Sequence, residues 1–72
     1  MHTAIVLWYR TWEVREATRG FGIAEDEQGR SIFLHHTNLV NSSVNLSSGD
    51  LIEFDLYIES KGYVAYNISL RV

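Results

Sequence analysis

Hydrophobic and polar residues alternate along two stretches of this chain, and a period of two residues is typical of a half-buried β-strand. The clearest stretch is Ser31–His36, where Ile32 and Leu34 would point to one face and Phe33 and His35 to the other. The same alternation runs through Leu51–Ile58. Both stretches therefore predict strands with one face in a hydrophobic core.

Two further segments are rich in β-branched and aromatic residues, which favour strands: Thr3–Arg10 and Tyr63–Leu70. Gly20–Ala24 is interpreted as another strand, weakened and bent by its glycines. Polar, glycine-containing turns are expected at Glu25–Arg30, Ser48–Asp50 and Glu59–Gly62. The charged segment Thr11–Thr18 is interpreted as a loop or an extended hairpin tip, and helix is confined to one turn near Thr37–Val40. Five short strands separated by turns predict an all-β fold, a closed or nearly closed small barrel.

The length of 72 residues allows one domain, residues 1–72, with a single core. The chain has no cysteine, so neither a disulfide framework nor a thiolate zinc site is expected. The apolar run Ala4–Tyr9 is too short for a signal peptide, and no stretch is long enough for a membrane span. We therefore expect a soluble, cytoplasmic monomer without a membrane partner.

Aromatic residues are more informative than charge in this sequence. Nine of the 72 residues are Trp, Tyr or Phe, which is more than one small core easily buries. The net charge is −3, and Lys61 is the single lysine beside five arginines. A surface that is aromatic but weakly basic favours stacking on nucleobases over contacts with phosphates.

Two motifs carry a family resemblance. The segment Arg19–Ile23 resembles the first ribonucleoprotein motif of cold-shock domains, basic-Gly-Phe-Gly-Phe, and Ile32–His36 resembles the second, apolar-Phe-apolar-His-Phe. Upstream, Ala4–Tyr9 is similar to the first strand of that family. Further similarities to its last two strands occur at Gly49–Asp50, Phe54, Lys61–Gly62 and Ala65–Ile68. The resemblance covers nearly the whole chain.

The resemblance implies a five-stranded antiparallel OB-fold barrel that binds single-stranded RNA or DNA with low sequence specificity. It also implies a role as an RNA chaperone or a modulator of transcription or translation, with no cofactor and no catalytic residues. The positions matching the family's nucleic-acid-binding residues are Trp8, Tyr9, Arg19, Phe21, Phe33, His35, His36 and Lys61. The glycines that flank Phe21 would let bases approach the strand closely.

Several positions depart from the family pattern. Leu7 replaces a lysine, and Ile23 and His36 replace phenylalanines, so the binding face loses one cation and two phenyl rings. Tyr66 stands where the family has a small residue, which predicts a repacked core. The segment Thr11–Thr18 is longer than the family's first hairpin loop. These departures affect the expected affinity more than the expected fold.

Other readings of the same residues are weaker. Phe21 and Phe33 could be core residues, although Ile32 and Leu34 already occupy the inward face of that strand. Adjacent histidines on a strand point to opposite faces, so His35 and its neighbour do not suggest a metal site. The acidic turn at residues 25–27 lacks the pocket that acid–base catalysis needs, and we do not expect an enzyme.

The main alternative function is a protein-interaction module or inhibitor that binds a polymerase, nuclease or ribosome. Leu7, Ile23 and the Thr11–Thr18 loop favour it, whereas the intact aromatic motifs oppose it. A third interpretation is a relation to the small bacterial translation initiation factor, which has the same barrel. Trp12 stays open at this point: it could cap the barrel, extend the binding face or dock a protein.

Overall fold

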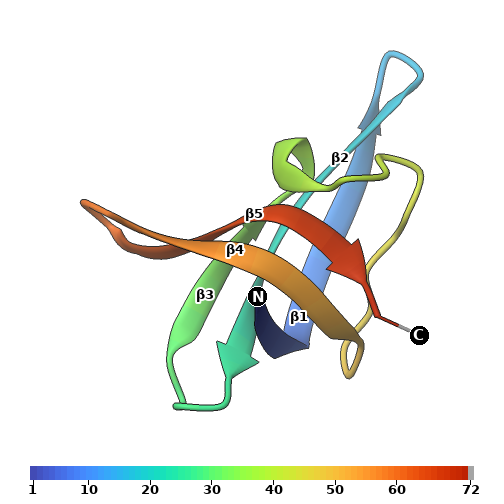
Figure 1. Cartoon of the computed structure of the whole chain (residues 1–72). Helices are drawn as coiled ribbons and strands as arrows, with labels where there is room; N and C mark the ends of the chain where they lie inside the picture. Colours follow the sequence, from blue (N-terminus) through green and yellow to red (C-terminus); the bar gives the residue numbers. More distant parts are fainter. Residues whose placement is uncertain (72) are drawn as a thin grey trace.

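A computed structural model, which describes residues 1–71, contains five strands and one short 3₁₀ helix (Figure 1). In chain order they are β1 (His2–Val14), β2 (Ala17–Asp26), β3 (Ser31–His35), η1 (His36–Asn38), β4 (Leu51–Glu59) and β5 (Gly62–Leu70). No helix among residues 1–71 has the length and hydrophobicity to cross a membrane.

The strands close into a barrel in the order β1-β2-β3-β5-β4, with β4 pairing back to β1. Four of the five pairings are antiparallel, and β3 and β5 pair in parallel. This one pair corrects the expectation of a purely antiparallel sheet. It arises because the chain crosses from β3 to β4 through η1 and a long loop, and then returns as β5 in the direction of β3. The all-β barrel itself is confirmed, and its topology is consistent with an OB-fold.

The core is built by the alternating residues that face the barrel interior. Ile32 and Leu34 of β3 are fully buried, as are Ile52 and Phe54 of β4, so the alternation expected in both strands is confirmed. The remaining buried core residues are Ala4, Val6, Ala24, Leu46, Ala65 and Ile68. Because these residues come from β1, β2, the long loop and β5 as well, one small core joins every strand of the barrel.

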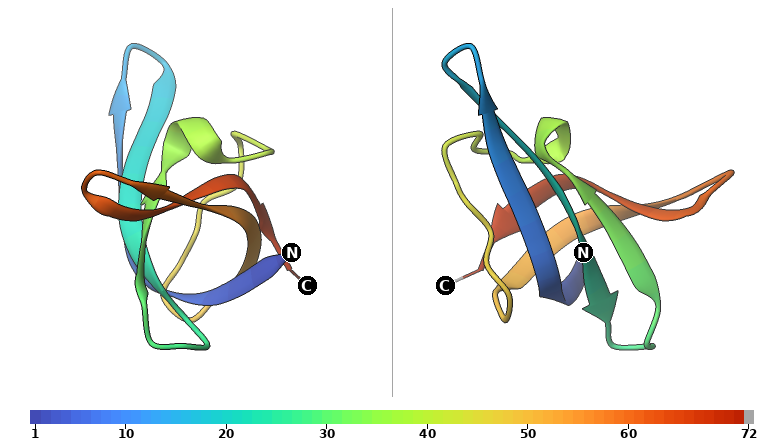
Figure 2. Two further views of the ribbon diagram at one scale, coloured as in Figure 1. Left: turned by 60° about the vertical axis from the view of Figure 1, so that its left-hand side comes forward. Right: turned by 180° about the vertical axis from the view of Figure 1, so that it is seen from behind.

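The β1–β2 hairpin is paired to its tip and projects beyond the barrel (Figures 1 and 2). The two strands stay paired out to Val14 and Ala17, which leaves only Arg15 and Glu16 in the turn. Both turn residues have positive φ, 49° and 67°, as a two-residue type I′ turn requires. The loop interpretation of Thr11–Thr18 was therefore wrong, and the extended hairpin interpretation is correct.

The β4–β5 hairpin also projects from the barrel, on another side (Figure 2). Tyr66 lies on its outer surface, where its ring packs edge-on against Tyr57 at a centroid distance of 4.8 Å and its hydroxyl donates to Glu59. The adjacent Ala65 occupies the core position instead. The expected repacking of the core around Tyr66 is therefore wrong, because the tyrosine points outward.

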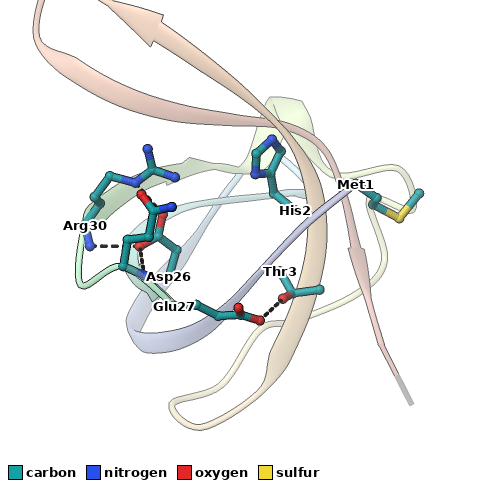
Figure 3. A pocket seen from close by; sticks show the side chains of 7 residues that line it. Met1, His2, Thr3, Asp26, Glu27 and Arg30 are labelled. Atoms are coloured by element: carbon teal, nitrogen blue, oxygen red, sulfur yellow. Dashed lines mark hydrogen bonds and ion pairs between the residues drawn. The ribbon is translucent and has the colours of Figure 1, made fainter.

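A small pocket of about 160 Å³ lies beside the β2–β3 turn (Figure 3). Asp26 organises this turn: one carboxylate oxygen accepts the backbone N–H of Gln28 at 3.0 Å and of Arg30 at 2.8 Å. The other oxygen pairs with Nε of Arg30 at 2.6 Å. Arg30 also lies over the ring of Tyr63, 4.8 Å from its centroid. The polar groups here serve the turn, and Arg30 is held in place by two partners.

Candidate nucleic-acid interface

The register of the sheet places the residues of both motifs on one outer face. Ile23 of β2 lies opposite Trp8 of β1 on one side and opposite Phe33 of β3 on the other. In the next row, Phe21 lies opposite His35. Residues that are directly opposite in a sheet point to the same side, so these side chains share the surface outside the barrel.

The rings on this face are accessible. Trp8 is 44% exposed and Phe33 is 38% exposed, and neither belongs to the core. Phe21 is half-buried because the ring of Trp8 packs edge-on against it, with centroids 5.6 Å apart. The alternative in which Phe33 is a core residue is therefore wrong, because Ile32 and Leu34 fill the inward face of β3.

The expectation that His35 and His36 point to opposite faces is wrong, because β3 ends at His35 and His36 begins η1. Their ring centroids lie 4.4 Å apart. Nδ1 of His35 accepts the backbone N–H of Thr37 at 3.3 Å, whereas Nδ1 of His36 donates to the carbonyl of Gly20 at 3.1 Å. Burial, followed by the neighbouring charges of His36 and Arg19, lowers the pKa of His35. Among residues 1–71 no three His, Cys, Asp or Glu side chains are grouped to hold a metal ion.

Glycine is required on both sides of Phe21 for a steric reason within the protein, not to let bases approach the strand as expected. A Cβ added at Gly20 would lie 2.8–2.9 Å from the ring of Tyr9, and one at Gly22 would lie 2.3 Å from the Trp8 carbonyl oxygen and 2.8 Å from the Tyr9 Cα. Because successive residues alternate, the glycines face the side opposite to Phe21. They make room for Tyr9 rather than for an approaching base.

Tyr9 is consequently separated from the exposed rings. Its side chain packs against the core, and its hydroxyl is buried without a hydrogen-bond partner in residues 1–71. Burial raises the pKa of this phenol. A ring in this position supports the β1–β2 pair from inside and does not present a face to a ligand, so we leave Tyr9 out of the candidate interface.

The basic residues expected at the site lie at its two ends. Arg19 is opposite Trp12 on the projecting β1–β2 hairpin, and Lys61 is at the tip of the β4–β5 hairpin. Lys61 and Phe33 line one groove of about 810 Å³. The other residues that line the groove are Ile23, Arg30, Ser31, Glu59, Ser60, Gly62, Tyr63 and Val64. A nucleic-acid strand bound over Phe33 would therefore have the ammonium group of Lys61 in the same groove.

One part of this face was missed by sequence reasoning. Val64 of β5 lies opposite Phe33 in the parallel pair and opposite Tyr57 in the antiparallel one, so the apolar row continues from β3 to β4. Val64 is buried, yet it lies outside the core cluster. Hydrophobicity alone could not show this, because Val64 and Ala65 are consecutive apolar residues and only the pairing of β3 with β5 decides their faces.

The comparisons with known proteins agree with this geometry. The family model of the 'Cold-shock' DNA-binding domain matches residues 3–71, nearly the whole length of the chain. A search of curated proteins found no match. This is a nucleic-acid-binding, non-enzymatic family. The extent of the match, on a five-stranded barrel that carries both ribonucleoprotein motifs on one face, shows that the chain belongs to the cold-shock domain family.

Proposed function

We propose that this protein binds single-stranded RNA or DNA with low sequence specificity by stacking bases on the outer face of β1, β2 and β3. The observation that carries the proposal is the row formed by Trp8, Ile23 and Phe33, in which two exposed rings lie on either side of an aliphatic residue. Phe21 and His35 form a second row beside it. Each stacked base contributes about 1–3 kcal/mol and any base can stack, which accounts for low specificity.

Stacking carries more of this binding than charge does. The chain has a net charge of −3, and Arg30, one of its few cations, is already paired with Asp26. Arg19 and Lys61 are the cations at the ends of the face. For single strands the logarithm of affinity falls by about 0.7 per neutralised phosphate for each tenfold rise in salt. Two or three phosphate contacts therefore give a slope between about −1.4 and −2.1, which is shallow.

The test is a titration of oligouridine and oligothymidine, followed by the tryptophan fluorescence of Trp8 and Trp12. Phe33→Ala should weaken binding by about 1–3 kcal/mol, and adding Phe21→Ala should remove most of what remains. Ile5→Ala is the matched control, because Ile5 is an apolar residue of similar exposure on β1, 43% exposed, in the neighbouring row with Glu25 and Ser31, which contains no aromatic ring.

Circular dichroism should first show that every variant is folded. If the folded double variant bound oligouridine like the parent while Arg19→Ala abolished binding, the stacking surface would be wrong. If no oligonucleotide quenched the parent protein at all, the exposed apolar face would indicate a protein partner instead.

A protein that holds bases in the stacked, unpaired state opposes base pairing, so we further propose that it melts weak RNA secondary structure. This activity is the expected basis of an RNA-chaperone or transcription and translation role. A short RNA hairpin with a fluorophore and a quencher at its ends should open on addition of the parent protein and stay closed with the Phe21→Ala/Phe33→Ala variant. If that variant also opened the RNA hairpin, melting would not depend on stacking at Phe21 and Phe33.

A further inference from the structure

The part of the β1–β2 hairpin beyond the barrel, which we call the arm (Arg10–Arg19), continues the series of aromatic rings. Trp12 packs edge-on against Phe21, with centroids 5.8 Å apart, and Phe21 contacts Trp8 on its other side. Trp12 is 43% exposed, almost the same as Trp8. Trp12 is four positions after Trp8 on β1, a span of about 13 Å at the usual strand rise. Trp8, Phe21 and Trp12 therefore form a continuous series of contacting rings from the barrel onto the arm.

Charge on the arm is separated between its two surfaces. Arg19 lies directly opposite Trp12, and Arg10 is two residues before Trp12 on the same strand, so both arginines share its surface. Glu13 points to the opposite surface by the same alternation, and the other carboxylate, Glu16, lies in the turn. Neither Arg10 nor Arg19 takes part in the ion pairs found within residues 1–71.

A surface with an exposed indole, two uncompensated cations and no carboxylate matches one class of ligand, a chain of flat rings joined by anions. Indole faces accept bases, and nearby guanidinium groups meet phosphates. A neutral protein segment would cover the indole but would desolvate both arginines without a counter-charge. The arrangement of charge therefore favours nucleic acid over a protein at this position.

We propose that Trp12 is an additional base-stacking position that extends the binding footprint from the barrel along the arm, with Arg10 and Arg19 at the phosphates. This inference rests on the proposed function, because the strand must already lie on the barrel face. A short oligonucleotide would fill the barrel face alone. A longer one would also reach Trp12.

The test is a length series of oligouridines from about 4 to 16 nucleotides, the range of site sizes of OB-fold proteins. Trp12→Ala should leave the affinity for the shortest binding oligomer unchanged and lower the affinity for long ones by about 5- to 150-fold, the equivalent of one stacked base. Trp12→Phe should keep the affinity close to that of the parent. Val14→Ala is the matched control, because Val14 is an apolar residue of similar exposure, 39%, farther along the same surface.

A second measurement locates the strand without relying on affinity. The chain has two tryptophans, so Trp8→Phe leaves Trp12 as the only indole. Its fluorescence should be quenched by long oligouridine and unaffected by the shortest binding oligomer. Quenching by both would place Trp12 inside the minimal site, contrary to the proposal.

The remaining outcomes separate this inference from the function on which it rests. If Phe33→Ala weakens binding while Trp12→Ala leaves the affinity for every oligouridine length unchanged, the arm is not used and only this inference fails. If Trp12→Ala weakens all lengths equally, Trp12 acts by supporting Phe21 and the extension is again wrong. If neither variant affects binding, the stacking function itself is overturned.

Discussion

Replacing Gly22 with alanine tests whether the close approach of β1 and β2 is what requires glycine. The added Cβ would lie 2.3 Å from the carbonyl oxygen of Trp8 and 2.8 Å from both the Cα and the Cδ1 of Tyr9. The first two are backbone atoms, so side-chain rotation alone does not relieve the clash and the two strands must move apart. At Gly20 the neighbouring atoms, 2.8–2.9 Å away, are the outer ring atoms of Tyr9, which is a side chain.

Overpacking a buried site costs about 1–3 kcal/mol, and a backbone clash belongs at the upper end of that range. In a domain of this size each kcal/mol lowers the melting temperature by about 4–8 °C, so Gly22→Ala should melt about 12–24 °C below the parent. Gly20→Ala should lower the melting temperature by less than Gly22→Ala does. Combining Gly20→Ala with Tyr9→Leu should cost less than the sum of the two single changes, because leucine lacks the clashing atoms.

Thermal unfolding followed by circular dichroism measures all of these variants, with Tyr9→Leu alone as the baseline for the double variants. The same Tyr9→Leu change should not restore the melting temperature of Gly22→Ala, because the two backbone contacts remain. A Gly22→Ala protein that melts within about 4 °C of the parent, less than 1 kcal/mol, would refute the reasoning. So would its rescue by Tyr9→Leu.

Three other predictions concern the β2–β3 turn, the arm and His35. Burial alone would raise the pKa of Asp26, but its hydrogen bonds from Arg30 and Gln28 outweigh burial and lower it. Asp26 therefore stabilises the fold above its unfolded pKa of about 3.9 and loses this effect as pH falls through its lower folded pKa. The difference in melting temperature between the parent and Asp26→Asn should shrink toward pH 2. A constant difference would exclude a contribution from the titration of Asp26. None of residues 12–17 is in the core, so replacing them with a Gly-containing turn should change the melting temperature by no more than about 4–8 °C from that of the parent, or 1 kcal/mol. A larger decrease would show that the arm stabilises the barrel. The pKa of His35 is lowered in the free protein, and bound phosphates should raise it. Affinity for oligouridine should therefore increase as pH falls from about 7.5 to 5.5, and His35→Gln should flatten this dependence. If the affinity of the parent did not change with pH, the ring of His35 would lie away from the bound nucleic acid.

The fold was largely predictable because the informative signals are local. Alternation in β3 assigned Ile32 and Leu34 to the interior and Phe33 to the surface, and the pairing with β2 then brought both motifs to one face. The direction of β5 was not predictable from alternation, because it depends on the path of the chain between β3 and β4.

Two errors have different physical causes, the unusual chemistry of one turn and the absence of register from sequence patterns. The arm looked like a loop because it is polar and its turn, Arg15-Glu16, lacks the glycine typical of two-residue hairpins. The reason for Gly22 was misjudged because only the β1–β2 register places Tyr9 against it. Composition identified these residues as unusual, and pairing decided what each of them does.

The most direct test of the central claim is to locate the bound bases by nuclear magnetic resonance. In a complex with oligouridine at saturation, nuclear Overhauser effects should connect the base protons of uridine with the ring protons of Trp8 and Phe33. Leu70, an exposed side chain at the end of β5 that pairs with Ile52 and lies outside this row, serves as an internal comparison and should show weaker effects or none. Saturable binding with base contacts at Leu70 and none at Trp8 or Phe33 would contradict the account, because the nucleic acid would then lie on another part of the barrel.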